Sequence, residues 1–82
     1  MNIIKVKDIN INSEKNILTV LFTNGVTKTI DFKEKFKDGK YIELIDKDLF
    51  TKAKVDVGGY GVSWSDDIDI SEYELWNTGN KI

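Results

Sequence analysis

Residues 16–32, NILTVLFTNGVTKTIDF, contain two runs in which apolar and polar residues alternate, one on each side of Asn24-Gly25. Successive side chains of a β-strand point to opposite faces, so this alternation predicts two strands that are each buried on one face. Asn-Gly between two such runs is a strong signal for a β-hairpin. The first half of the chain is therefore expected to be β structure.

The phase of the two runs indicates the length of the hairpin loop. A two-residue loop would place Leu18 opposite Asp31 and divide the apolar residues between the two faces of the sheet. A three-residue loop over residues 23–25 instead places Leu18 opposite Ile30, with the apolar residues on one face. We therefore expect three loop residues, with Gly25 in the left-handed region and a bulge there.

The segment before the hairpin carries a weaker strand signal. Residues 3–11, IIKVKDINI, predict another strand. Because the apolar phase changes between Val6 and Ile9, we expect this strand to bend or bulge near Lys7 and Asp8.

After the hairpin, two aspartates are placed to begin short helical turns. Asp31 and Glu34 fit a capping box for a turn that ends before Gly39. Asp46 fits the cap of a second turn that carries residues 49–50. The apolar residues between these turns are expected to cover the core from an irregular or short extended segment: Tyr41, Ile42, Leu44 and Ile45.

A second hairpin is predicted around Gly58-Gly59. The runs AKVDV at 53–57 and YGVSW at 60–64 pair if the two glycines form a two-residue turn. The opposite face of this hairpin is expected to be solvated, and Trp64 is interpreted as a core aromatic residue. The register places three apolar pairs on the core face: Val57 with Tyr60, Val55 with Val62, and Ala53 with Trp64.

The C-terminal segment predicts a short capped helix. Ser71 and Glu74 form a capping box, and Ile70 and Leu75 occupy the positions of a hydrophobic staple. Residues 77–79, Asn-Thr-Gly, supply the stop signal. A helix N-terminus favours negative charge, which we take to explain the acidic residues ahead of it: Asp66, Asp67 and Asp69.

The composition indicates a single domain that spans residues 1–82. The 82 residues are 40% hydrophobic with a net charge of −2, which is too apolar for a disordered chain. A chain of this length builds one core. We expect an α+β fold: a mainly antiparallel sheet of about five strands in two hairpins, with short helices that include the capped C-terminal helix.

Missing residue types exclude several classes of function. The chain has no cysteine, histidine or arginine, so disulfides and thiolate or imidazole metal sites are excluded. Without arginine, and with a pI near 5.0, direct nucleic-acid binding is not expected. No apolar run has the length of a signal peptide or of a membrane span, so we expect a cytoplasmic protein that does not contact membranes.

No group of residues in the sequence has the pattern of a catalytic or cofactor site. Asp66, Asp67 and Asp69 lack the spacing and the central glycine of a calcium-binding loop. Ser63 and Ser65 have no histidine to activate them. We therefore predict no catalytic, cofactor-binding or metal-binding residue, and no cofactor.

Three stretches together resemble a known family: LTVLFTNGVTKTIDF, LIDKDLFTKAKVD and GVSWSDDIDISEYELW. In this order and at these intervals they are similar to the bacterial domain-of-unknown-function family number 2442, over residues 3–76. Two positions depart from the family pattern, Ser65 where proline is usual and Trp76 where tyrosine is usual. The residues that match the family motifs are Phe22, Gly25, Lys28, Ile30, Asp31, Leu44, Asp46, Phe50, Trp64, Asp69, Ile70 and Leu75.

The resemblance implies a compact α+β domain that is antitoxin-like or regulatory and has no catalytic residue. The first hypothesis is therefore a non-enzymatic module that docks on a partner protein encoded nearby, as an antitoxin does, or as a phage or mobile-element inhibitor of a host defence complex. The second is a small-ligand, metal-binding or hydrolytic domain that uses Asp31, Asp56 or Asp69. An unpaired sheet edge is also compatible with a homodimer. The contact residues predicted under the first hypothesis are Asp66, Asp67, Tyr73 and Trp76.

Overall fold

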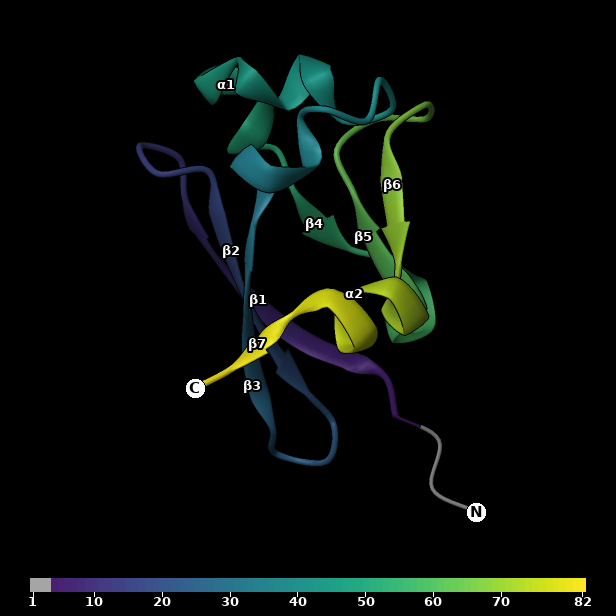
Figure 1. Cartoon of the computed structure of the whole chain (residues 1–82). Coiled ribbons are helices and arrows are strands. Elements are labelled where there is room, and N and C mark those ends of the chain that lie inside the picture. Colours follow the sequence, from purple (N-terminus) through teal and green to yellow (C-terminus); the bar gives the residue numbers. More distant parts are fainter. Residues whose placement is uncertain (1–3) are drawn as a thin grey trace.

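The computed structural model describes residues 4–82, which form seven strands and two α-helices (Figure 1). The strands are β1 (Val6–Asn12), β2 (Ile17–Phe22), β3 (Thr27–Asp31), β4 (Lys54–Val55), β5 (Gly61–Ser63), β6 (Asp69–Ser71) and β7 (Asn80–Lys81). The α-helices are α1 (Lys47–Phe50) and α2 (Glu72–Thr78), and the 3₁₀ segments are η1 (Phe32–Lys35), η2 (Ile42–Ile45) and η3 (Val57–Gly59).

The strands form two antiparallel sheets that face each other across the core (Figure 1). One sheet has the strand order β1-β2-β3-β7 and the other has the order β4-β5-β6. Buried side chains from both sheets belong to one hydrophobic cluster of the described residues. The predicted α+β class is confirmed. The strands are divided between two sheets, because the helical and irregular residues 32–53 carry the chain from one layer to the other.

The hairpin of β2 and β3 has the predicted register. Leu18 pairs with Ile30, and the N–H of Phe22 donates to the carbonyl of Val26 at 2.9 Å. Gly25 has a φ of +86°, in the left-handed region that glycine adopts without steric cost. The three-residue loop is thus confirmed.

Strand β1 contains the expected irregularity. Val6 pairs with Phe22 and Asp8 pairs with Leu21, so Lys7 is an extra residue between two pairs. This β-bulge allows the apolar residues before and after it to face the core despite the change in their phase.

The hairpin of β4 and β5 also has the predicted register, with Val55 opposite Val62. Its last backbone bond before the turn joins the N–H of Asp56 to the carbonyl of Gly61 at 2.9 Å. The two strands are therefore paired as predicted as far as residue 56. Gly58 and Gly59 lie in the turn that follows.

The predicted burial of Val57 and Tyr60 on that core face is wrong. Val57 is 97% exposed and Tyr60 is 66% exposed. Gly58 and Gly59 both have positive φ and turn the chain through the 3₁₀ segment η3. The two apolar residues therefore belong to the turn and not to the ends of the paired strands.

Both predicted aspartate caps are present. The Asp31 carboxylate accepts from the N–H of Lys33 at 3.0 Å at the start of η1. The Asp46 carboxylate accepts from the N–H of Asp48 at 2.9 Å at the start of α1. The capping box with Glu34 is not formed, because the tighter 3₁₀ turn brings the N–H of Lys33 to the Asp31 carboxylate instead.

The 3₁₀ segment η2 determines which residues of the middle region are buried. Residues three apart share one face of a 3₁₀ helix. Tyr41 and Leu44 are buried, whereas Ile42 and Ile45 are 44% and 53% exposed. The prediction that all four residues cover the core is therefore wrong for the two isoleucines.

Phe32 is at the centre of an aromatic cluster in the core. Its ring makes edge-to-face contacts with the rings of Tyr41, Phe50 and Trp64 at centroid distances of 5.8, 5.6 and 5.2 Å. Trp64 is 5% exposed, and its Nε1–H donates to the Phe50 carbonyl at 3.1 Å. The interpretation of Trp64 as a core residue is confirmed.

Helix α2 begins and ends at the predicted residues. The Oγ of Ser71 accepts from the N–H of Glu74 at 3.1 Å, and the N–H of Gly79 donates to the Leu75 carbonyl at 3.0 Å. The Glu74 carboxylate lies 3.4 Å from the Nζ of Lys35. Glu74 therefore links α2 to η1 through its side chain while its backbone is capped by Ser71.

Replacing Ser71 with alanine is expected to lower the free energy of unfolding by about 1 kcal/mol, because the N–H of Glu74 loses its acceptor. Urea denaturation followed by circular dichroism measures this change. Ser71→Asp retains an acceptor at the same position and should stay within about 0.5 kcal/mol of the wild type. An alanine variant as stable as the wild type would show that this cap does not support α2.

Candidate functional site

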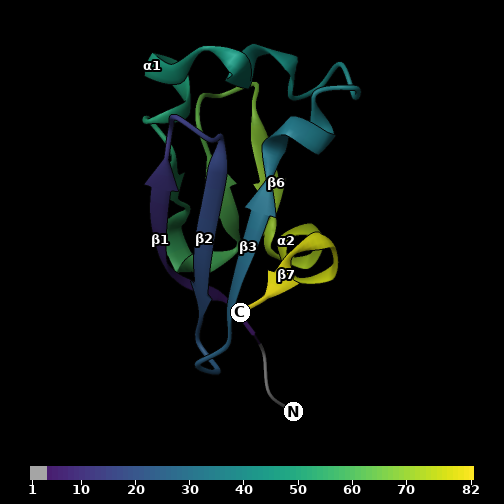
Figure 2. The same cartoon turned by 60° about the vertical axis from the view of Figure 1, so that its left-hand side comes forward.

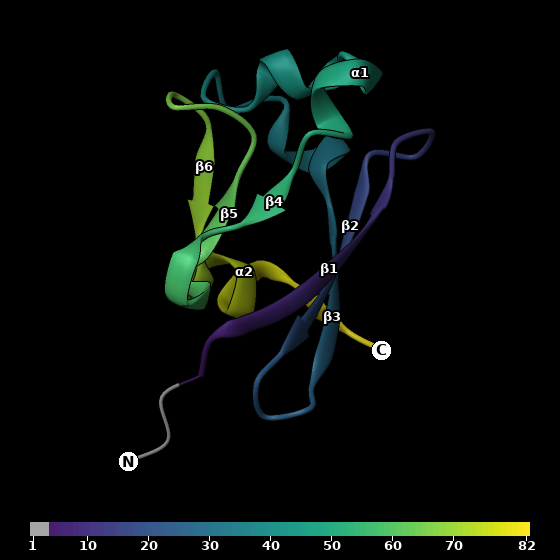
Figure 3. The same ribbon diagram turned by 180° about the vertical axis from the view of Figure 1, so that it is seen from behind.

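The four predicted contact residues lie in two separate places. Asp66 and Asp67 are exposed in the turn between β5 and β6, whereas Tyr73 and Trp76 lie on α2. Strand β6 runs from the acidic turn to the start of α2, so the turn and the helix lie at opposite ends of the second sheet (Figures 1 and 3). The structure therefore does not bring the acidic pair and the helix aromatics together.

Because of this separation, the field at the N-terminus of α2 does not explain why Asp66 and Asp67 are acidic. The favourable field at a helix N-terminus falls off within about one turn, and the extended strand β6 separates Asp66 and Asp67 from α2. Within the turn, the N–H of Asp67 donates to the Oγ of Ser65 at 3.3 Å. Asp66 and Asp67 are thus exposed charges of a tight turn.

Trp76 packs at the margin of the core. Its ring meets the buried ring of Phe22 edge to face, with centroids 4.9 Å apart. The Nζ of Lys28 lies 3.8 Å from the centroid of the Trp76 ring and donates to the Trp76 carbonyl at 2.6 Å. Lys28 therefore attaches the last turn of α2 to the first sheet, and Trp76 is only partly accessible to a partner. Tyr73, by contrast, is 75% exposed.

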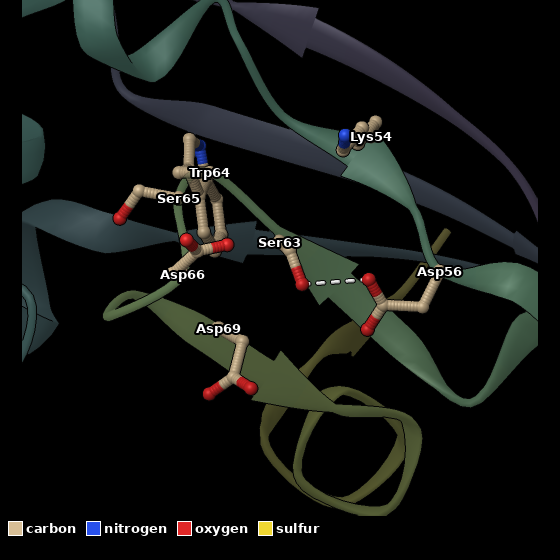
Figure 4. A pocket seen from close by; sticks show the side chains of 7 residues that line it. All are labelled: Lys54, Asp56, Ser63, Trp64, Ser65, Asp66 and Asp69. Carbon is tan, nitrogen blue, oxygen red and sulfur yellow. Dashed lines mark hydrogen bonds between the residues drawn. The ribbon is translucent and has the colours of Figure 1, made fainter.

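An open polar depression of about 340 Å³ lies on the outer side of the second sheet (Figure 4). The Oγ of Ser63 donates to the Asp56 carboxylate at 2.6 Å. The backbone of Asp69 pairs with that of Ser63 across the strands. The depression is lined by Lys54, Asp56, Ser63, Trp64, Ser65, Asp66 and Asp69.

The side chains of this depression give it a net negative charge, which attracts cations. It holds three carboxylates and one ammonium group, and a serine bonded to aspartate has no imidazole to activate it. Asp31 is not among the lining residues, because it caps η1. Of the three aspartates named in the second hypothesis, Asp56 and Asp69 line the depression together and Asp31 does not. Within residues 4–82, no three histidine, cysteine or carboxylate side chains are grouped to hold a metal ion.

The hydroxyl of Tyr41 joins three segments below the surface. It lies 3.4 Å from both the Asp69 carbonyl and the Glu74 carboxylate. Burial raises the pKa of Tyr41 to about 12, and the negative charge of Glu74 adds to this effect. The hydroxyl therefore keeps its proton near neutral pH, where it serves as a hydrogen-bond donor that connects η2 to β6 and α2.

Sequence reasoning missed an exposed apolar surface at the end of the molecule that carries α2. The carbonyl of Tyr60 accepts from the N–H of Glu72 at 2.8 Å, which places the η3 turn beside the first turn of α2 (Figures 1 and 3). We call this the end surface and define it by three exposed residues of these two segments: Val57, Tyr60 and Tyr73.

The η3 turn of the end surface is held firmly. The N–H of Gly59 donates to the Asp56 carbonyl at 2.8 Å. A Cβ atom on Gly59 would lie 2.5 Å from the Val6 carbonyl oxygen, so the turn backbone packs directly on β1. The Nζ of Lys5 lies 4.3 Å from the centroid of the Tyr60 ring and 4.0 Å from the Glu72 carboxylate. The signal in the sequence that could have indicated this turn is the pair Gly58-Gly59. Its flanking residues Val57 and Tyr60 point outward.

The residues that match the family motifs build the fold. Gly25 occupies a left-handed turn position, Asp31 and Asp46 cap helical segments, and Lys28 binds the end of α2. Most of the others are buried in the core: Phe22, Ile30, Leu44, Phe50, Trp64, Ile70 and Leu75. Most of these residues therefore serve the architecture, while the exposed Asp69 lines the depression.

Comparison with known protein families confirms the family resemblance. A family model described as "Protein of unknown function (DUF2442)" matches residues 6–80. No curated protein and no solved structure matches the chain. Among the helices of residues 4–82, none combines the length and the apolar character needed to cross a membrane.

Proposed function

The chain belongs to the DUF2442 family, and we propose that it is a non-enzymatic module that docks on a partner protein. Most residues that match the family motifs are buried or hold turns and helix ends, so the proposal looks for binding on the exposed surface. Among the described residues, the exposed end surface is the feature that supports docking best.

The observation that carries this proposal is the exposure of Val57, Tyr60 and Tyr73 in adjacent segments. Val57 is 97% exposed and Tyr73 is 75% exposed. Burial of apolar area against a partner is favourable by roughly 25 cal/mol per Å². Tyrosine is also among the residues that most often dominate binding energy, because it combines a large apolar ring with a hydroxyl group.

The rigidity of the turn supports the same proposal. Association costs free energy when flexible loops become ordered, so a surface that is already ordered binds with less loss. Backbone bonds from Asp56 to Gly61, from Gly59 to Asp56 and from Glu72 to Tyr60 hold the turn against β5 and α2. The end surface is therefore displayed in one arrangement before a partner arrives.

We further propose an antitoxin-like or regulatory role in the cytoplasm, with a partner encoded by a neighbouring gene. The family resemblance is the support for this role. An inhibitor of a host defence complex, carried by a phage or mobile element, would use the same docking surface. All these roles require a stable complex with one protein, so one binding experiment tests them together.

The experiment uses the purified product of the neighbouring gene and isothermal titration calorimetry. Val57→Ser combined with Tyr73→Ser is expected to weaken binding roughly tenfold or more, as loss of buried hot-spot residues does. Both residues are exposed, so the stability of the free chain should change little.

Ile42→Ser combined with Ile45→Ser is the matched control, because it removes two exposed apolar residues of η2 elsewhere on the surface. This pair should leave the affinity unchanged. Asp66→Asn with Asp67→Asn, measured at low salt, tests the acidic turn. A loss of affinity caused only by the isoleucine or aspartate pair would contradict docking through the end surface.

A further inference from the structure

The outer face of the four-stranded sheet is uncovered by other elements of the described chain (Figure 2). Strand pairing arranges its side chains in three rows, because paired residues point to the same face. The rows are Asp8-Leu21-Thr27, Asn10-Thr19-Thr29-Asn80 and Asn12-Ile17-Asp31. We call these ten residues the sheet face.

The sheet face differs in charge from the rest of the chain. The chain contains 12 basic residues, all of them lysine, and none is among these ten residues; the exposed bulge residue Lys7 stands beside Asp8 at the β1 edge of the same face. Lys28 lies in an intervening row with its Nζ bonded to the Trp76 carbonyl on the other side of the sheet. The charged members are Asp8 and Asp31, at diagonally opposite corners. Charged residues are likewise depleted at the centre of protein interfaces.

A hollow of about 150 Å³ lies in this face beside Asp8. Its lining residues include the apolar Leu21 and the acidic Asp8, which are paired across β1 and β2. Lysine and arginine side chains combine an apolar stem with a cationic end. The lining of the hollow matches both parts of such a side chain.

We propose that the sheet face is a second docking surface, whose partner protein inserts a lysine or arginine side chain into the hollow beside Asp8. The partner covers the threonine and asparagine rows with uncharged residues. The sheet face shares no residue with the end surface, so a partner could occupy either surface without the other.

The test uses the peptide acetyl-Thr-Arg-Thr-amide as the probe and amide chemical shifts of the ¹⁵N-labelled full chain as the readout, at low salt. We expect saturable shifts confined to residues 8–10, 19–21 and 27. The neutral peptide acetyl-Thr-Gln-Thr-amide should bind about threefold more weakly, because it lacks the charge that pairs with Asp8. Asp8→Asn should weaken binding of the arginine peptide about threefold, as expected for an exposed ion pair.

The variants are chosen so that folding does not obscure the result. Asparagine keeps the Oδ1 atom that accepts from the N–H of Ile9 at 2.8 Å. Thr27→Lys places a competing cation at the hollow and should abolish saturable binding, whereas Asp66→Asn should change nothing. The proposal is overturned if the shifts do not saturate, if they centre on the depression at residues 54–69, or if Asp8→Asn binds as tightly as the wild type.

Discussion

Replacing Trp64 with alanine is expected to lower the free energy of unfolding by about 3–5 kcal/mol, the largest effect of any single side-chain truncation considered. The ring is 5% exposed and lies between Phe32, 5.2 Å away by centroid, and Phe50, 6.0 Å away. Alanine would leave a cavity between the two sheets that the surrounding rings cannot fill. Urea denaturation followed by far-ultraviolet circular dichroism measures the change.

Trp64→Phe separates the contribution of the ring from that of the indole N–H. Phenylalanine keeps much of the aromatic packing but leaves the Phe50 carbonyl without the donor that lies 3.1 Å away. Its cost is expected to be about 1–3 kcal/mol and smaller than that of alanine. An alanine variant that loses less than about 1 kcal/mol would show that Trp64 is not part of the core.

Replacing Gly59 with alanine is expected to destabilise the domain by about 3 kcal/mol, from two causes that add. Gly59 has a φ of +76°, a region that costs a non-glycine residue about 1 kcal/mol or more. The new Cβ atom would also lie 2.5 Å from the Val6 carbonyl oxygen and 2.9 Å from the Cβ of Lys5. Relief of this overlap requires the η3 turn to move away from β1, at a further cost of about 1–3 kcal/mol.

Gly25→Ala is the matched control, because it measures only the cost of placing alanine at a positive φ. Gly25 has a similar φ of +86°, but no atom lies within 4 Å of the position where its Cβ would stand. Its expected cost is only about 1–2 kcal/mol. The difference between the two variants, read from the same denaturation experiments, therefore measures the packing of the turn on β1. Equal costs would contradict that close contact.

The parts of the fold that could be predicted are those determined by local periodicity and capping. The alternation around Gly25 determined the register of Leu18 with Ile30, because a slip by one residue would have moved every apolar side chain to the wrong face. The helix cap at Ser71 was predictable because its donor at Glu74 lies three residues away. Both depend on neighbours in the sequence.

The errors arose where backbone conformation was not specified by the apolar pattern. Ile42 and Ile45 were expected in the core, but a 3₁₀ turn places Tyr41 and Leu44 inward and these two outward. Val57 and Tyr60 were predicted to pair as the last residues of two strands. The glycines between them instead form η3, so both residues belong to the turn. In both cases burial was predicted because the residues are apolar, although large apolar side chains are often exposed.

The end surface could not be predicted, because it depends on contact between distant segments. The bond from the Glu72 N–H to the Tyr60 carbonyl joins residues twelve apart in the sequence, and no local pattern specifies it. Tyr73 was nevertheless identified as a contact residue from its place on a short helix, and it lies on the end surface with 75% of its area exposed. Its association with Asp66 and Asp67 failed because β6 separates them.

Hydrogen–deuterium exchange of the full chain, with and without the product of the neighbouring gene, tests the central claim of docking through the end surface most directly. Binding is expected to slow the exchange of amides in residues 57–60 and in the first turn of α2. Residues 42–45, whose isoleucines are also exposed, should exchange at unchanged rates. Slowed exchange confined to the acidic turn at residues 65–69, with residues 57–60 unaffected, would contradict it.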